Sequence, residues 1–442
     1  MKQFLRKLIP FIILLITVSS VKEQMDFPVG NTVVWWTIYA LTLYLLAISK
    51  QYYFDKKDSK KINVILWYLS WNVFAIVRGL FVAENYWEWK NLVGTAMVLL
   101  LPLSIYISTN KIIVQQILTL WVRYALPLFF IFYPFFQEGD ASGRYLVPIS
   151  FILLFFPLLN TKWRLIIVAF SLIVLFGDLS ARSNVIKFGV PIVLASTYYM
   201  RNFLTTRLME IGRVILMLLP IILFSLGVMG IFNVFKMDEY VSGTYTTKSL
   251  LEGQINEANL LTDTRTFLYK EVLSSAFKYD YVWLGRSPAR GNESATFGSF
   301  ALEELRTGKM ERFGNEVSIL NIFTWTGIIG VILYFLVFYR ASYLAINKSN
   351  NIFIRIVGLS VAFRWAYAWV EDFSNFDLSY FFLWLMIGMC YSRSFRAMSN
   401  LEMKLWIKGV FDKKYRVKYN SFSEQRALNY NNAPDNKSVL NF

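Results

Sequence analysis

The sequence predicts an all-α polytopic membrane protein with about 12 transmembrane helices and a large, partly helical extracytoplasmic loop between helices 9 and 10. The first observation is composition: 56% of the 442 residues are hydrophobic, a larger share than soluble domains have. The second is that the apolar residues gather in repeated runs of about 18 or more, the length that crosses a bilayer. The third is a single long polar interruption, residues 235–314, late in the chain.

The apolar runs set the order of the predicted spans. The first run follows a basic start, and we interpret it as an uncleaved span, with a signal peptide as the alternative. No internal repeat of about 20–50 residues is visible. The predicted spans cover residues 8–20, 31–48, 62–82, 91–109, 112–135, 144–160, 163–177, 184–199, 211–234, 315–339, 351–370 and 378–395.

The distribution of charge orients these spans. The connections 49–61, 200–210 and 340–350 are basic, whereas the connections that alternate with them are acidic or neutral. Because basic segments stay in the cytoplasm, we predict cytoplasmic N- and C-termini and an extracytoplasmic 235–314 loop. The chain then divides into transmembrane helices 1–9 (residues 1–234), the loop (235–314), helices 10–12 (315–396) and a basic cytoplasmic tail (397–442).

Composition also excludes several function classes. The net charge of +16 is typical of membrane proteins whose basic loops face anionic lipid, so we expect no nucleic-acid partner. The chain has no histidine and one cysteine, Cys390. This excludes His-ligated zinc, Ser-His-Asp and Cys-His catalysis, and an intramolecular disulfide. We expect no cofactor and no metal, and chemistry that uses carboxylates, arginines, lysines, tyrosines or backbone groups.

A charge within a span is costly and therefore indicates function, and three of the arginines within predicted spans are candidates. They are Arg78, Arg123 and Arg364. The alternative for each is a snorkelling or ion-paired structural arginine. We prefer the structural interpretation for Arg123. Arg78 and Arg364 stay open, because their spans both end in outward carboxylates, as in Glu371-Asp372.

A short polar turn between predicted spans seven and eight, residues 177–184, carries Arg182 between serines. Its side chains and backbone N–H groups could hold an anionic oxygen cluster. The alternative is a polar turn that satisfies its own hydrogen bonds. The predicted topology places Arg182 on the same side of the membrane as the 235–314 loop, which favours anion binding.

Arg265 opens a predicted helix within the loop. Thr262 or Asp263 is the predicted N-cap, and the helix runs through Leu273. Arg265 would then lie in the first turn, where a helix N-terminus and a guanidinium together attract phosphate.

A Gly/Pro-rich segment, residues 283–292, follows and carries Arg286 and Arg290. It lacks the Gly-Lys-Ser/Thr ending of a Walker loop. Two guanidiniums suit a diphosphate, because arginine binds phosphate oxygens bidentately. Where the chain returns to an apolar span, Glu316 is either a helix-capping acid or a general base.

These motifs resemble those of the O-antigen polymerase and ligase superfamily of bacterial envelope glycosyltransferases. The resemblance rests on the Ser180–Ser183 turn, Arg265 at the loop helix, the Trp283–Gly285 segment and the Gly327–Gly330 element after the loop. Ligase-like members commonly have a His-Asn pair where the loop re-enters the membrane, and here the pair is Asn315-Glu316. The resemblance therefore favours a repeat-unit polymerase over a ligase.

The resemblance implies a bacterial inner-membrane enzyme that acts on undecaprenyl-diphosphate-linked oligosaccharide. It would transfer a growing polysaccharide from its lipid diphosphate onto the terminal sugar of another lipid-linked repeat unit, making O-antigen, as in lipopolysaccharide, or capsule. Chain-length regulator and flippase proteins are possible partners. Arginines would stabilise the leaving diphosphate, so we expect a metal-independent glycosyltransferase. The predicted catalytic residues are Arg182, Arg265 and Glu316, and the predicted substrate-binding residues are Arg78, Arg286, Arg290, Arg364, Trp283 and Tyr281.

Aromatic residues near the outer ends of the spans could stack on sugar faces, although interfacial aromatics are common in membrane proteins. Two rival functions stay open: ligase-type transfer of polymer to another acceptor, and a lipid-linked oligosaccharide flippase or other transporter, for which a long folded loop is not needed. A non-catalytic assembly partner is a further alternative. The aromatic candidates are Tyr86, Trp87, Trp89, Tyr281 and Trp283.

Overall fold

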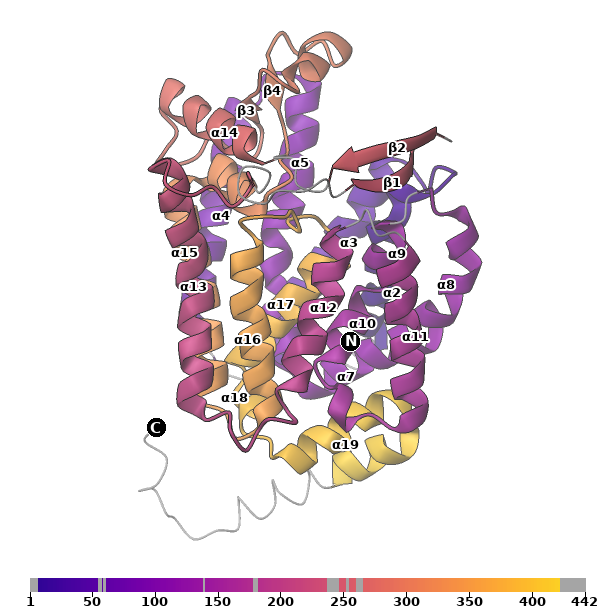
Figure 1. Ribbon diagram of the computed structural model, residues 1–442. Coiled ribbons are helices and arrows are strands. Elements are labelled where there is room, and N and C mark those ends of the chain that lie inside the picture. Colours follow the sequence, from indigo (N-terminus) through magenta and orange to yellow (C-terminus); the bar gives the residue numbers. More distant parts are fainter. Residues whose placement is uncertain are drawn as a thin grey trace.

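The computed structural model shows a bundle of roughly aligned helices with a folded cap at one end and a crossing helix at the other (Figure 1). We call the capped end the loop face, because residues 265–317 lie there. We call the opposite end the tail face, because residues 400–411 lie there. For Arg182 and residues 246–251 and 254–259 only the backbone is described. The structure describes residues 7–54, 58, 61–137, 140–177, 182–236, 246–251, 254–259 and 265–421.

The chain is a multi-pass membrane protein. Among the described residues, 6 helical stretches are long and apolar enough to cross a membrane. Shorter apolar helices lie at residues 183–196 and 378–391. The six long stretches are residues 32–53, 63–82, 86–108, 111–135, 206–228 and 318–347.

The first part of the bundle is built from helices that asparagine side chains begin. Asn31, Asn85 and Asn110 each accept a hydrogen bond from a backbone N–H in the first turn of the following helix, which is the usual N-cap arrangement. The elements are η1 (Ile9–Phe11), α2 (Ile12–Val21), η2 (Lys22–Gln24), α3 (Thr32–Tyr53), α4 (Asn63–Val82), α5 (Tyr86–Leu100), η4 (Leu101–Ser104), α6 (Ile105–Ser108), α7 (Lys111–Leu120), η5 (Trp121–Ala125), α8 (Leu126–Phe132), η6 (Tyr133–Phe135), α9 (Asp140–Tyr145), α10 (Val147–Leu153) and η7 (Phe156–Leu158).

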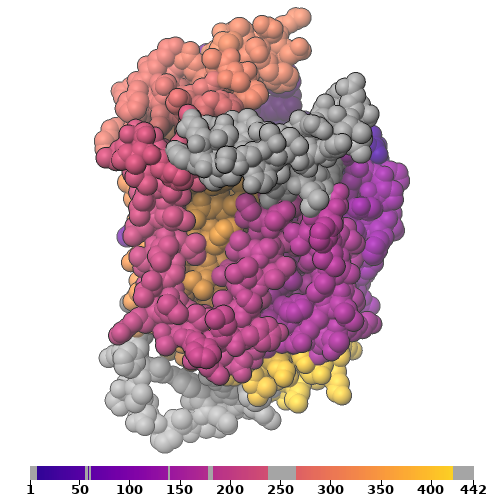
Figure 2. Space-filling model, in the orientation of Figure 1, coloured from indigo at the N-terminus to yellow at the C-terminus, as the bar shows by residue number. Residues whose placement is uncertain are grey.

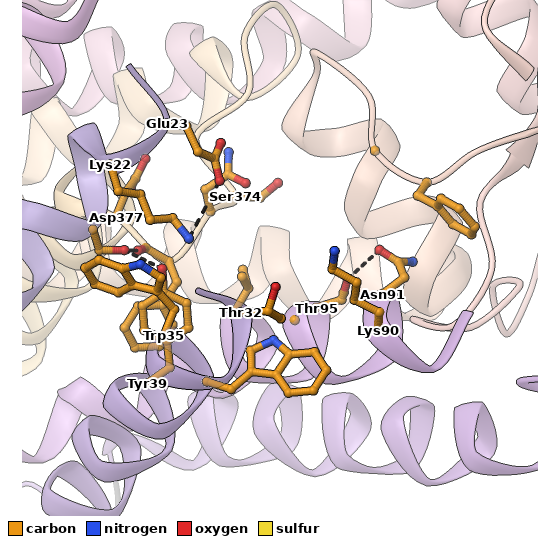
Figure 3. Close-up of a pocket in the computed structure, with 18 of the residues that line it drawn as sticks. Lys22, Glu23, Thr32, Trp35, Tyr39, Lys90, Asn91, Thr95, Ser374 and Asp377 are labelled. Carbon is orange, nitrogen blue, oxygen red and sulfur yellow. Dashed lines mark hydrogen bonds and ion pairs between the residues drawn. The ribbon is translucent and has the colours of Figure 1, made fainter. Parts of the chain in front are cut away.

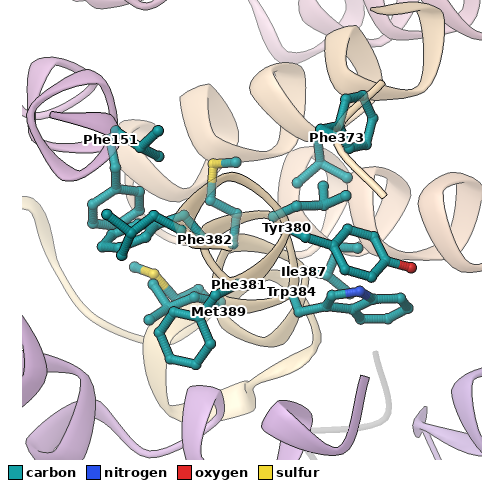
Figure 4. Close-up of a cluster of buried hydrophobic side chains, with 14 of the residues drawn as sticks. Phe151, Phe373, Tyr380, Phe381, Phe382, Trp384, Ile387 and Met389 are labelled. Atoms are coloured by element: carbon teal, nitrogen blue, oxygen red, sulfur yellow. The ribbon is translucent and has the colours of Figure 1, made fainter. Parts of the chain in front are cut away.

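The C-terminal helices form the centre of the bundle. Every residue of α17 is buried, and a helix that is apolar on all sides belongs inside a bundle. Around α17, side chains such as Phe151, Phe382 and Trp384 pack into one apolar cluster (Figure 4). The elements are α11 (Thr161–Gly177), α12 (Arg182–Ser196), α13 (Thr206–Val228), α15 (Ser318–Asn347), α16 (Ile352–Tyr367), α17 (Leu378–Tyr391), α18 (Arg393–Arg396) and α19 (Asn400–Phe411).

The segment between α13 and α15 folds over the loop face (Figure 1). It contains an antiparallel hairpin, a helix and a second, two-residue strand pair in which Asn292 faces Arg312 and Glu293 faces Glu311. Glu84, in the α4–α5 connection, and Glu88, on α5, hold this segment: Lys309 Nζ lies 2.7 Å from Glu84 Oε2 and 2.5 Å from Glu88 Oε1. The elements are β1 (Thr246–Leu251), β2 (Gln254–Asn259), α14 (Thr266–Lys278), β3 (Asn292–Glu293), η9 (Phe300–Glu304) and β4 (Glu311–Arg312).

Helix α15 bends where the loop packs against it. Gly327 has φ +68°, which lies outside the helical region, and its N–H and Cα approach the backbone of Trp283 and Gly285 so closely that a Cβ would overlap both. Glycine alone combines this φ with so close an approach of another chain segment. The Gly-Ile-Ile-Gly element therefore provides a docking point for the 283–285 segment.

The structure confirms the all-α membrane class, and every predicted span contains helix. The number of spans and their orientation stay predictions. The predicted caps Thr262 and Asp263 lie outside the described residues. The predicted position of Arg265 is wrong, because α14 begins at Thr266 with Arg265 as its N-cap residue, and the helix continues past Leu273 to Lys278.

Candidate functional site

Arg265 connects three segments that are far apart in the sequence. Its Nε donates to the carbonyl oxygen of Val370 (3.1 Å), just after α16. Its Nη1 lies 3.2 Å from Glu316 Oε2, and its Nη2 lies 3.6 Å from Glu371 Oε2. One guanidinium thus joins the start of α14, the entry to α15 and the exit from α16. The structure brings the predicted pair Arg265 and Glu316 into direct contact.

A second guanidinium shares Glu316. Arg312 Nη2 lies 3.1 Å from Glu316 Oε1, and the Arg312 guanidinium stacks over the Phe297 ring at 4.3 Å. The Glu316 side chain is 50% exposed, whereas those of Arg265 and Arg312 are 21% and 16% exposed. An incoming anion can therefore compete with an exposed carboxylate for two guanidiniums that stay in place.

Glu371 is a functional candidate that the sequence motifs do not predict. Burial raises the pKa of Glu371, and nearby Lys187 and Arg265 offset only part of that shift. A carboxylate with a raised pKa is a better proton acceptor. The sequence signal was present, since Glu371 ends the span that contains Arg364, but hydropathy does not reveal its contact with Arg265. We call Arg265, Arg312, Glu316 and Glu371 the guanidinium–carboxylate cluster.

The start of α12, at Arg182, lies at the same end of the bundle. Residues 178–181 lie outside the described residues, and α12 begins at Arg182. The next residue, Ser183, accepts a hydrogen bond at its carbonyl from the Tyr367 hydroxyl (3.5 Å). Tyr367 lies one turn before Glu371, whose N–H donates to the Tyr367 carbonyl at 3.0 Å. The start of α12 therefore packs beside the segment that carries Glu371.

An apolar groove lies on one side of the cluster. It has a volume of about 440 Å³ and runs between α12, α13, α14 and α16. Figure 2 shows the hollow between α13 and α12, with orange residues of the C-terminal helices at its floor. Two residues that line the groove adjoin Arg265. Thr266 follows it in the sequence, and the Val370 carbonyl accepts a hydrogen bond from it. Other lining residues are Leu219, Leu223, Phe224, Gly227, Tyr269 and Trp369.

A larger cavity lies on the other side. Its volume is about 930 Å³, and it is bounded by α3, α5, the 313–315 segment and the 372–377 connection. Asn315 and Asp372 line it, and they adjoin Glu316 and Glu371. In Figure 3, Trp35 and Tyr39 stand on one side of this cavity, opposite Asn91 and Thr95 on the other. The guanidinium–carboxylate cluster thus lies between groove and cavity.

Two other predicted substrate-binding arginines are engaged in buried ion pairs. Arg286 Nη2 lies 2.9 Å from Glu311 Oε1. Arg290 forms a bidentate ion pair with the same carboxylate and lies 3.6 Å from Glu88 Oε1. The hydrogen bonds to Glu311 raise the pKa of Arg290. These contacts hold the 283–292 segment against β4 and α5.

The predicted intramembrane arginines differ in their surroundings. Arg78 donates to the carbonyl oxygens of Leu284 (2.7 Å) and Gly285, so it fixes the loop to α4. Arg364 is buried and donates to the Ser379 carbonyl and hydroxyl, both at 3.1 Å. Arg123 is exposed on η5, 5.6 Å from the Tyr124 ring.

The predicted sugar-stacking aromatics differ in exposure and position, although the rings of Tyr86 and Trp87 contact each other with centroids 5.1 Å apart. Tyr281 is buried, with its hydroxyl 3.5 Å from the Val272 carbonyl. Trp283 is 66% exposed. Tyr86 and Trp89 are exposed and do not line the cavity, whereas Trp87 does. Sequence analysis missed Trp35, Trp36 and Trp325, which line the cavity from inside predicted spans.

Fold and site together define a multi-pass membrane protein with a guanidinium–carboxylate cluster between an apolar groove and a polar, aromatic cavity. Comparisons with protein-family models, curated proteins and solved structures find no match for this chain. Among the described residues, no group of three or more cysteine or acidic side chains is placed to hold a metal ion.

Proposed function

We propose that the protein is a membrane glycosyltransferase that polymerises undecaprenyl-diphosphate-linked oligosaccharide repeat units into O-antigen or capsular polysaccharide. The observation that supports it is the position of Arg265, between an apolar groove and a polar, aromatic cavity. A lipid-linked saccharide has an apolar tail, an anionic diphosphate and a polar sugar chain. The groove suits the tail, Arg265 suits the diphosphate, and the cavity suits the sugar chain.

The groove suits a prenyl chain because its wall is almost entirely aliphatic and aromatic. Its cationic end suits the diphosphate. Arg265 adjoins the lining residues Thr266 and Val370, and Lys270 lines the groove. In an environment of low dielectric, guanidiniums that are already fixed stabilise developing negative charge without having to reorganise. Val370 and Glu371 fix Arg265 in this way.

The proposed step forms one bond and breaks one. A hydroxyl oxygen of the acceptor sugar attacks the anomeric carbon of the donor, and the bond from that carbon to the diphosphate oxygen breaks. The diphosphate departs with the electron pair and is held by Arg265 and Arg182. The hydroxyl proton passes to a carboxylate. No oxidant, reductant or metal takes part in this balance.

Two carboxylates can serve as the base. Glu316 is the more exposed and is shared by two guanidiniums. Glu371 is more buried, and its pKa is raised. Diphosphate binding would displace carboxylates from Arg265, which leaves either one available to the acceptor hydroxyl. Glu316→Gln and Glu371→Gln separate these roles: the base variant loses transfer at all pH values, whereas the other retains the wild-type pH profile.

The proposal is tested with purified protein in nanodiscs and a defined undecaprenyl-diphosphate repeat unit, with and without chelator. We expect chain extension in both conditions. Arg265→Ala and Arg182→Ala should each abolish it while the protein still inserts and unfolds at the wild-type temperature. Arg306→Ala, an exposed arginine of the same loop, is the matched control and should extend chains normally. Full-length polymer from both Arg265→Ala and Arg182→Ala would refute the proposed site.

The rival functions predict different products in cells that lack the gene. Loss of a polymerase leaves single repeat units on the surface, loss of a ligase leaves polymer on its lipid carrier, and loss of a flippase leaves repeat units inside. Only the first outcome agrees with the proposal.

A further inference from the structure

The large cavity on the loop face is polar and aromatic at once. Tryptophans from three segments line it, together with amide side chains that both donate and accept hydrogen bonds. A sugar ring presents apolar C–H faces and hydroxyls that donate and accept, so the two surfaces match. The lining tryptophans are Trp35, Trp36, Trp87 and Trp325, and the lining amides are Gln24, Asn31, Asn91, Asn315, Asn321 and Asn375.

Charge in the cavity wall is balanced. The wall contains three basic residues and three acidic residues. Lys22 Nζ lies 3.7 Å from Glu23 Oε1, and Arg144 Nε lies 2.6 Å from Asp140 Oδ2, so two of the cations face carboxylates. A diphosphate would require a clear excess of positive charge, which this wall does not offer. The six charged residues of the cavity wall are Lys22, Lys90, Arg144, Glu23, Asp372 and Asp377.

Two side chains of the wall keep unused hydrogen-bonding groups. Asn315 Oδ1 and Trp325 Nε1 are buried and have no hydrogen-bond partner among the described residues. The Asn315 backbone is fixed, because its N–H donates to Asn321 Oδ1 (2.7 Å) and its carbonyl accepts from Asn321 Nδ2 (2.9 Å). An unused acceptor and an unused donor in the same wall are groups that ligand hydroxyls can satisfy.

From these observations we infer that the cavity is the binding site for an uncharged oligosaccharide, namely the sugar chain of the acceptor. The identification of this oligosaccharide as the acceptor rests on the proposed function. Asn315 and Asp372 place the inner end of the cavity next to Glu316 and Glu371, the two carboxylates that can take a hydroxyl proton. The donor diphosphate belongs on the opposite side, where Thr266 and Val370 border the apolar groove.

The test uses full-length protein in nanodiscs and the repeat-unit oligosaccharide of the source cells, released from lipid and labelled with 2-aminobenzamide. Binding is followed by fluorescence anisotropy. We expect Trp36→Ala and Trp87→Ala each to weaken binding at least tenfold. Trp89→Ala is the matched control, because it lies on the same helix as Trp87 and outside the cavity wall; it should bind as wild type.

Three further measurements decide the assignment. Arg265→Ala should bind the labelled saccharide as wild type, although it no longer extends chains. Saturating inorganic pyrophosphate should not displace the saccharide. Wild-type affinity in both Trp36→Ala and Trp87→Ala, or displacement by pyrophosphate, overturns the inference. Saccharide binding without any chain extension by wild-type protein would refute the proposed function and leave the saccharide site standing.

Discussion

Glu311 is the residue whose loss should loosen the loop face most. Its side chain is 4% exposed and pairs with both Arg286 and Arg290, whose side chains are 10% and 14% exposed. Glu311→Gln keeps the size and shape of the side chain but removes its charge. Two guanidiniums then stay in a poorly solvated site without their shared counter-ion.

The expected magnitude follows from that burial. Removal of one partner from a buried ion pair costs about 3–5 kcal/mol, because the remaining charge is left without compensation. The cost falls on local unfolding of residues 283–315 rather than on the helix bundle, since the pairs lie within this segment and α5. At about 1.4 kcal/mol for each factor of ten, backbone amides there should exchange about 10²- to 4 × 10³-fold faster.

Hydrogen exchange of the protein in nanodiscs measures the faster exchange of these amides. Reporter amides are those of Arg286, which donates to the Thr324 carbonyl at 2.7 Å, and Ser294, which donates to the Met310 carbonyl at 3.0 Å. Both should lose protection in Glu311→Gln, while amides of α16 and α17 should keep it. Local openings of this kind report the stability of one segment separately from that of the whole protein.

The matched control is Glu293→Gln. Glu293 faces Glu311 across the β3–β4 pair, and it pairs with Lys278 at 2.7 Å, but both side chains are well exposed, at 35% and 59%. Solvent screens such pairs, and they contribute little to stability. We expect only a few-fold change in exchange. Equal exchange in Glu311→Gln and Glu293→Gln would refute the view that Glu311 fixes the loop.

Three more predictions concern the bundle and its openings. Gly327→Ala should destabilise the protein by at least about 1–3 kcal/mol, because φ +68° disfavours a side chain and the neighbouring loop backbone leaves no room for one. Gly212→Ala, which has open space around it, should leave the stability unchanged. Thermal unfolding of both variants measures the difference. Burial raises the pKa of Asp377 from 3.8 to about 6, so the folded protein holds this proton more tightly than the unfolded chain. The free energy of unfolding should therefore fall as pH rises from 3.8 to about 6. Asp377→Asn should remove that fall in thermal scans, and an unchanged pH profile would contradict the prediction. Gly227→Phe should fill the apolar groove and raise the KM for the lipid-linked donor at least tenfold, whereas Leu218→Phe, elsewhere on α13, should leave the KM unchanged.

The sequence by itself determined the class of the protein and the places of its helices. Length and hydropathy of a segment are local properties, and a bilayer or an apolar core selects for both. Each predicted span therefore contains helix. Asn31, Asn85 and Asn110 are similarly local signals, because an N-cap contacts only the next turn. The change in polarity over residues 235–314 predicts a loop separate from the spans, and that division of the chain stays a prediction.

Only the tertiary structure decided which charges meet. Arg286, Arg290 and Arg265 look alike in the sequence, yet the first two share Glu311 while Arg265 faces Glu316 and Glu371. Such pairs join residues that are not neighbours in the sequence, from 21 positions apart for Arg290 and Glu311 to more than a hundred for Arg265 and Glu371, and they depend on how whole segments pack. The cavity is decided in the same way, since no single segment contributes its wall. Hydropathy is a property of one residue, whereas packing determines that a residue such as Glu311 is buried and what it is buried against.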